Sequence, residues 1–266
     1  MEDTVFNNVV RAFAALPEVE AIALGGSRVT SQFDASSDYD LYIYVAHPID
    51  VDIRRDLLRQ YCSYIELDNQ YWETEDDCVL ANGIPIDILY RNLADISSQV
   101  EQVKHGLAYN GYTTCVWNNI VTSKVLYDAE GKYTALKESL EIPYPETLRK
   151  NIIEKNRNLL SGQLPSYDQQ IRKAVQRQDL PSVSHRTAAF IESYFDILFA
   201  LNRMFHPGEK RMMEKLRNAP LLPDQFEENL RTLFATEFTD PDAFLQTLQQ
   251  IIDNLDRLLE QDRVNE

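Results

Sequence analysis

Hydrophobic residues follow two different spacings along this chain, and the change between them limits the folds that the sequence can adopt. Up to about residue 142, short apolar segments such as 19–24 and 38–45 read as strands between helical segments. From Pro145 onward, apolar residues recur at helical intervals, ending in a stripe that includes Phe244, Leu248 and Ile251. We therefore predict an α/β (α+β) domain over residues 1–142, followed by an all-α helical domain over residues 143–266.

Charge and hydropathy narrow the range of partners. The formal net charge is −16, from 42 acidic and 26 basic residues. Such a charge repels a phosphate backbone, so it disfavours a nucleic-acid partner and would attract a cationic small molecule, although many soluble proteins are simply acidic. No apolar run approaches the roughly 20 residues that span a bilayer, and the N-terminus carries no signal-peptide pattern. We predict a cytoplasmic protein without a membrane segment.

The cysteines predict no metal site and no disulfide framework. Cys62, Cys78 and Cys115 are odd in number, widely separated in sequence and free of any CxxC or histidine pattern. We expect all three to be buried as small hydrophobic side chains rather than to act as reactive thiols.

A β-hairpin is predicted in the middle of the first domain. Segments 78–81 and 84–90 flank Asn82-Gly83, the strongest short signal for such a turn. Pro85 cannot donate a ladder hydrogen bond, so we expect its strand to lie locally at a sheet edge. The acidic stretch from Trp72 to Asp77 is interpreted as a solvated loop, with help in binding a cationic acceptor as the alternative.

Two aspartates two residues apart provide the first chemical signal. Asp38 and Asp40 begin the second predicted strand, and residues at this spacing point to the same face. Two carboxylates about 4 Å apart repel by roughly 4 kcal/mol at an effective dielectric of 20. A cation between them removes that cost, and Mg²⁺ bound together with substrate phosphates suits such oxygen ligands.

A third carboxylate follows in the hairpin. Ile86 and Ile88 occupy one face of the strand and leave Asp87 on the other. An acid in such an apolar strand is costly to bury without a partner, which a shared metal site would supply. Upstream, Gly25-Gly26 at the end of a strand lets the backbone approach a triphosphate, whose oxygens the Ser27 hydroxyl can bind.

Gly25-Gly26-Ser27, then Asp38-Tyr39-Asp40 and later Asp87 together resemble the signature of the DNA polymerase β-like nucleotidyltransferase superfamily. This superfamily includes aminoglycoside and lincosamide nucleotidyltransferases, toxin–antitoxin nucleotidyltransferases and CCA-adding enzymes. The resemblance implies a head built on a short mixed sheet, in which Asp38 and Asp40 hold two Mg²⁺ ions and Asp87 is a metal ligand or general base. It also implies that the nucleotide is bound by residues that precede the aspartates, namely Gly25, Gly26, Ser27, Arg28 and Ser37.

The C-terminal half resembles, less specifically, the helical domain that follows this head in bacterial proteins. The stretch that carries the likeness runs from Leu198 to Lys210. By analogy with aminoglycoside adenylyltransferases, Lys210 is expected to contact the nucleotide phosphates, with a solvated lysine as the alternative. Glu192 is either an acceptor-site base or a salt-bridged helix carboxylate.

These observations predict Mg²⁺-dependent transfer of a nucleoside monophosphate from an NTP, expected to be ATP, to a hydroxyl of a small-molecule acceptor. The acceptor is expected to be cationic, and pyrophosphate is released. The alternatives are nucleotidylation of a protein or tRNA and a non-catalytic nucleotide-binding module. The sequence does not specify the acceptor, the preferred base or the oligomeric state.

Overall fold

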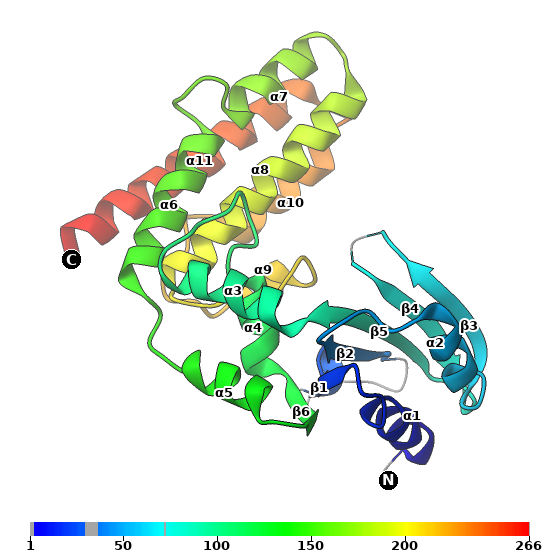
Figure 1. Cartoon of the computed structure of the whole chain (residues 1–266). Coiled ribbons are helices and arrows are strands. Elements are labelled where there is room, and N and C mark those ends of the chain that lie inside the picture. Colours follow the sequence, from blue (N-terminus) through cyan, green and yellow to red (C-terminus); the bar gives the residue numbers. More distant parts are fainter. Residues whose placement is uncertain (1–2, 30–36, 72, 266) are drawn as a thin grey trace. The chain divides into compact units, whose positions relative to one another are not determined.

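The chain forms two compact units. The computed structural model describes residues 3–29, 37–71 and 73–265. One unit, here called the sheet unit, comprises Met1–Glu101 and Val116–Pro143 (Figure 1). The other, the helical unit, comprises Gln102–Cys115 and Tyr144–Glu266. Within the described residues, no helix is both long enough and apolar enough to cross a bilayer.

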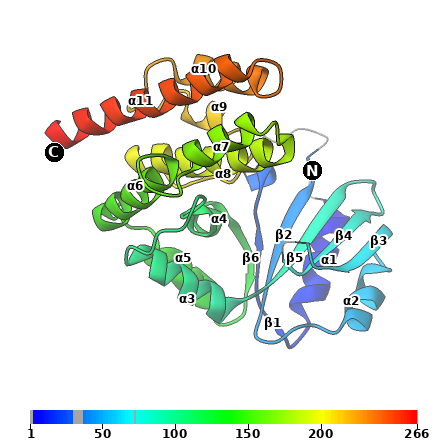
Figure 2. The same ribbon diagram turned by 90° about the horizontal axis from the view of Figure 1, so that it is seen from above.

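The sheet unit is built on a single six-stranded sheet (Figure 2). The strands lie in the order β3-β4-β5-β2-β1-β6, where β2 and β5 run parallel and every other neighbouring pair is antiparallel. The predicted mixed sheet, followed by an all-helical region, is therefore confirmed. The strand bounds are β1 Val19–Leu24, β2 Tyr39–Val45, β3 Cys62–Asn69, β4 Glu75–Leu80, β5 Pro85–Asn92 and β6 Lys124–Asp128.

Alternation along the strands gives this sheet one apolar core face. Leu41 and Ile43 of β2 are fully buried in a cluster that also contains Phe13 of α1 and Leu58 of α2. Asp3 starts α1 because its carboxylate accepts hydrogen bonds from two backbone N–H groups of the first turn. The helices of this part of the chain are α1 Thr4–Ala14, the short 3₁₀ helix η1 Ser27–Val29, α2 Val51–Leu58, α3 Leu93–Lys104, α4 Cys115–Thr122 and α5 Lys132–Ser139.

Strand β5 lies in the interior of the sheet, so the edge position expected from Pro85 holds only locally, at Pro85 itself, because the pairing with β2 starts at Ile86. It is hydrogen-bonded to β4 on one side and to β2 on the other. Pro85 is tolerated because it is the first residue of the strand, where a missing donor interrupts the ladder least.

The predicted hairpin forms between β4 and β5, but its loop is one residue longer than an Asn-Gly turn alone implies. The Leu80 N–H donates to Ile84 O at 2.9 Å, and the Gly83 N–H donates to Leu80 O at 2.8 Å. Gly83 has φ +86°, the left-handed conformation typical of the last position in a three-residue hairpin loop. This loop pairs Asp77 with Asp87, where a two-residue loop would place Cys78 opposite Asp87.

The acidic stretch that was expected to be a solvated loop is in large part a strand. Glu75 opens β4, and Asp76 is fully buried against Arg54, whose guanidinium lies 2.7 Å from its carboxylate. Trp72 lies outside the described residues. Strand β3, which pairs with this stretch, was not predicted, because its Ser, Glu and Asp residues weaken the strand signal.

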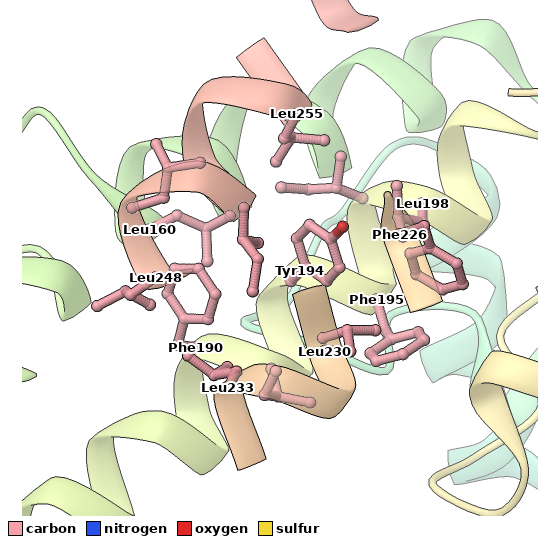
Figure 3. Close-up of a cluster of buried hydrophobic side chains, with 14 of the residues drawn as sticks. Leu160, Phe190, Tyr194, Phe195, Leu198, Phe226, Leu230, Leu233, Leu248 and Leu255 are labelled. Carbon is pink, nitrogen blue, oxygen red and sulfur yellow. The ribbon is translucent and has the colours of Figure 1, made fainter. Parts of the chain in front are cut away.

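The helical unit packs around α8, which is almost entirely buried from Phe190 to Leu201. Figure 3 shows Phe190, Tyr194 and Phe195 of this helix among leucines from its neighbours. A helix that is apolar all round must be surrounded by other helices, which explains its central place. The helices are α6 Glu146–Leu160, α7 Tyr167–Gln176, α8 Leu180–Leu201, α9 Met212–Leu216, α10 Phe226–Thr236 and α11 Pro241–Asn265.

One buried carboxylate in α8 joins a loop to this core. Asp196, 1% exposed, accepts hydrogen bonds from the Thr113 N–H at 3.1 Å and the Thr113 hydroxyl at 2.7 Å. The Asn156 amide donates a third at 3.0 Å. Burial still dominates over these bonds and raises the pKa of Asp196 to about 6.

Candidate active site

Two of the three predicted carboxylates, Asp40 and Asp87, lie on the sheet face opposite the apolar core, and Asp38 is close enough for its charge to raise the pKa of Asp87. Asp38 immediately precedes β2, Asp40 lies within it, and Asp87 lies within the parallel neighbour β5. Asp40 and Asp87 are direct Cα partners across these two strands. Leu41 and Ile88, the next residues along each strand, point into the core, so the carboxylates point the other way.

Negative charge around Asp87 changes its ionisation. The pKa of Asp87 is raised to about 6, first by burial and then by the nearby charges of Asp38, Asp77, Asp40 and Glu75, in that order. Each of these neighbours is itself an acid, so a positive charge bound beside Asp87 would lower its pKa.

The acidic cluster extends beyond the predicted residues. Asp77 of β4 faces Asp87, and Glu66 of β3 faces Asp77, so four acids form one row across four adjacent strands together with Asp40. Sequence reasoning missed Asp77 and Glu66 as site residues because their alignment depends on the hairpin register and on an unpredicted strand. The spacing of Glu75 and Asp77, two residues apart like Asp38 and Asp40, was the available signal.

Two glycines make room for this site. A Cβ added to Gly26, which has φ +63°, would lie 1.6 Å from Oδ2 of Asp40. A Cβ added to Gly25 would lie 2.4 Å from the Tyr42 ring. Any side chain at either position would therefore displace a β2 residue that lies on the site face. The position of Tyr42 thus requires a glycine at residue 25, and the position of Asp40 requires one at residue 26.

Arg28 fixes the backbone that leads into the aspartates. Its Nε donates to Ser37 O and to Asp38 O, each at 2.9 Å, and its guanidinium lies 4.0 Å from the centre of the Tyr39 ring. Arg28 and Ser27 belong to η1, directly after the glycines. These hydrogen bonds join residue 28 to residues 37 and 38, so Arg28 sets the position of the Asp38 backbone. Nucleotide binding by Ser27, Arg28 and Ser37 stays a prediction.

A further ion pair, between a buried arginine and a partly exposed glutamate, lies on the same face. Arg91 of β5 is 8% exposed and donates to both Glu73 oxygens, at 2.7 and 2.6 Å. Its guanidinium lies 4.2 Å from the centre of the Tyr42 ring, the ring that covers Gly25. Arg91 therefore packs on the Tyr42 ring, and Gly25 leaves room for that ring. The sequence gave no signal for this role.

The carboxylates suit Mg²⁺ but do not form a closed coordination shell. Over residues 3–29, 37–71 and 73–265, no three His, Cys, Asp or Glu side chains converge closely enough to hold a metal ion. Oxygen-only donors with excess negative charge nevertheless match a cation that keeps its own waters and substrate phosphates as ligands. The raised pKa of Asp87 shows that such a charge would relieve existing repulsion.

The two candidates from the C-terminal half lie in the helical unit. Lys210 is exposed and precedes α9, and its contact with phosphates stays a prediction. Glu192 of α8 is half-buried, and burial raises its pKa. The backbone of Gly111 packs directly on it, because a Cβ added there would lie 3.0 Å from Glu192 Cβ.

Comparisons with known proteins return one family model and several solved structures. The model, described as a domain of unknown function (DUF4037), matches residues 113–212, less than half of the chain. No curated protein matches. A nucleotidyltransferase-like protein from Exiguobacterium sibiricum is similar at 14% identity over 96% of this chain and 75% of that chain, with a TM-score of 0.46.

Two adenyltransferases are similar at lower TM-scores. An aminoglycoside 6-adenyltransferase from Bacillus subtilis matches at 12% identity over 96% of this chain and 92% of that chain, with a TM-score of 0.28. A spectinomycin adenyltransferase from Enterococcus faecialis, solved with ATP and spectinomycin, matches at 12% identity, 95% and 98% coverage and a TM-score of 0.28. At these values, the chemistry of this chain has to be argued from its own residues.

Proposed function

We propose that this protein is a Mg²⁺-dependent nucleotidyltransferase that moves a nucleoside monophosphate from an NTP, with ATP as the first candidate, to a hydroxyl of a small cationic acceptor. The observation that carries the proposal is the pairing of Asp40 with Asp87 on adjacent parallel strands, beside Asp38 and directly against Gly26. The charges that raise the pKa of Asp87 all come from neighbouring acids, which favours a ligand cation at this place.

In the proposed reaction, the acceptor hydroxyl oxygen attacks the α-phosphorus and pyrophosphate leaves. Asp38 and Asp40, with Asp87, would hold Mg²⁺, which supplies neutralisation of charge on the phosphates. In the alternative role, outside the coordination shell, Asp87 would be the general base that takes the proton of the attacking hydroxyl. Arg28 keeps the Asp38 backbone in place, and the glycines leave room for Asp40 beside the nucleotide.

The acidic row supports the choice of a cationic acceptor. Asp77, Glu66 and Glu75 continue the negative charge of the site onto β4 and β3, where no metal role is needed from them. This surface would attract ammonium groups and repel the phosphates of a tRNA. The net charge of −16 acts in the same direction.

The proposal is tested with labelled ATP and Mg²⁺ against cationic aminoglycosides and aminocyclitols, neutral sugars, tRNA and cell lysate. We expect acceptor-dependent pyrophosphate release with a cationic compound, lost in Asp40→Asn and retained in Asp52→Asn, a control on the exposed face of α2. MgATP at a hundred times its dissociation constant should stabilise the fold by about 2.7 kcal/mol. No labelled product with any acceptor, together with unchanged melting in MgATP, would refute the proposal. If only tRNA or a lysate protein were labelled, nucleotidyl transfer would be supported, but the proposal of a small cationic acceptor would be wrong.

A further inference from the structure

Two of the three cysteines, distant in sequence, meet on the core face of the sheet. Cys62 opens the edge strand β3, and Cys78 lies in the adjacent strand β4. Both pack into the hydrophobic cluster of the sheet unit. The expectation that all three cysteines are buried is confirmed for Cys78, which is 4% exposed, whereas Cys62 and Cys115 are only half-buried.

A β-bulge brings the first cysteine to this face. Ile65 and Leu67 of β3 point into the core, so regular alternation would direct Ser63 inward and Cys62 outward. The register shifts between Cys62 and Tyr64, where β3 contains one extra residue relative to β4. Cys62 therefore faces Leu80 on the core side, with Cys78 as its diagonal neighbour.

The two thiols contact each other. The Cys78 thiol forms a hydrogen bond with Cys62, and this bond lowers the pKa of Cys62. The same bond is the largest cause of the raised pKa of Cys78. Cys62, half-buried on an edge strand, is thus the better nucleophile and the one that an external reagent can reach.

We infer that Cys62 and Cys78 form a thiol–disulfide site, oxidised by a small-molecule disulfide, that reversibly fastens β3 to β4. The Cys62 thiolate attacks the reagent RS–SR, giving a Cys62–S–SR mixed disulfide and releasing RS⁻. The Cys78 thiol, no longer bonded to a thiolate, loses its proton and attacks the Cys62 sulfur, expelling the second RS⁻. The two protein thiols are oxidised to a disulfide, and one RS–SR is reduced. The two protons that the protein thiols lose are taken up by the two released thiolates, which become two RSH.

The consequence is local because both residues belong to the outer pair of strands. Strand β3 has a neighbour on one side only and is held there by its ladder to β4. A covalent link at the bulge, the point where that ladder is interrupted, suppresses separation of the pair. This inference goes beyond the proposed function and requires neither nucleotide nor acceptor for its test.

The experiment treats the full-length reduced protein with oxidised glutathione, blocks the remaining thiols with a maleimide and measures intact and peptide masses. We expect loss of the Cys62 and Cys78 thiols without retained glutathione, and the same result in Cys115→Ser. In Cys78→Ala the reaction should stop as a glutathione adduct on Cys62. In Cys62→Ser, which changes only a half-buried position, Cys78 should stay reduced. Stable glutathione on Cys62 beside a free Cys78 in the wild type, or preferential reaction of Cys115, would overturn the inference.

Amide hydrogen exchange provides the second readout. Oxidation should slow exchange within Cys62–Asn69 several-fold, and dithiothreitol should restore the original rate. The Cys62→Ser protein should show no change on the same treatment. If the disulfide forms and exchange in β3 is unaffected, the fastening of β3 to β4 is disproved.

Discussion

Asp87 in the sheet unit and Asp196 in the helical unit have the same raised pKa, about 6, for different reasons. Burial is the largest cause in both. Hydrogen bonds from Thr113 and Asn156 oppose it at Asp196, whereas at Asp87 every further cause is another acid. One carboxylate is thus supported by hydrogen bonds from its own fold, whereas the other lies among like charges that a bound cation would offset. This difference separates a structural acid from a candidate catalytic one more clearly than burial or pKa alone.

The largest effect is expected from neutralising the site itself. Asp87→Asn and Asp40→Asn should each reduce nucleotidyl transfer by on the order of a thousand-fold or more, because a metal-site charge worth several kcal/mol is lost. Thermal unfolding should show equal or greater stability, since each change removes one of several repelling charges. A clear loss of stability in Asp87→Asn would show that Asp87, like Asp196, is a structural carboxylate, and the distinction between the two would be wrong.

Gly26→Ala should come next, and it tests whether space beside Asp40 matters for activity. The new methyl group would occupy the position of the Asp40 carboxylate, so transfer should fall by roughly a hundred-fold as that group is pushed aside. Gly131→Ala is the matched control, because Gly131 also has a positive φ, +72°, but has nothing within 4 Å of the added Cβ. Both variants should lose about 1 kcal/mol of stability from backbone strain. Equal activity in the two would show that the Asp40 position is not critical.

Asp196→Ala should lower the free energy of unfolding and should not act directly on nucleotidyl transfer. It leaves the Thr113 N–H, the Thr113 hydroxyl and the Asn156 amide without their shared acceptor in a buried place. We expect a loss of about 2–4 kcal/mol in urea unfolding, typical of a broken buried hydrogen-bond network. Asp253→Ala, at an exposed position of α11, should stay within about 0.5 kcal/mol of wild type. A similarly small change at position 196 would mean that its hydrogen bonds contribute little net stability.

The sequence was informative where a short segment determines the geometry. Side chains two apart on a strand share a face, so Asp38 and Asp40 could be placed together without knowing their neighbours. Asp87 was found for the same reason, since Ile86 and Ile88 must be buried and it cannot join them. The helical half was equally readable because its apolar stripes persist over several turns.

Features that depend on pairing between segments could not be predicted in this way. The acidic row requires the three-residue hairpin loop, and one residue fewer would have put Cys78 opposite Asp87. The contact between Cys62 and Cys78 requires a bulge in β3, which has no sequence signature of its own. The Asp196 network joins residues far apart in the chain, and Thr113 and Asn156 are unremarkable until α8 brings an acid between them.

The smallest expected effect is the pH dependence that Asp196 alone gives to stability. Its pKa rises from 3.8 in the unfolded chain to about 6 in the folded protein, so the folded state binds more protons between these values. Stability from this group is therefore present at low pH and is lost as pH rises through about 6. Between about pH 8 and pH 5 the gain should be about 1.4 kcal/mol.

Asp196→Asn isolates that contribution, because the variant cannot titrate at this position. The difference in unfolding free energy between wild type and variant, measured in urea at a series of pH values, should change by the stated amount and level off above about pH 7. His206, buried with its pKa lowered to about 4, acts in the opposite direction, and Tyr144 lies close enough to Asp196 for their charges to interact. Both are common to the two proteins and so cancel to first order. A pH-independent difference would mean that Asp196 titrates as an ordinary carboxylate, and its resemblance to Asp87 would no longer hold.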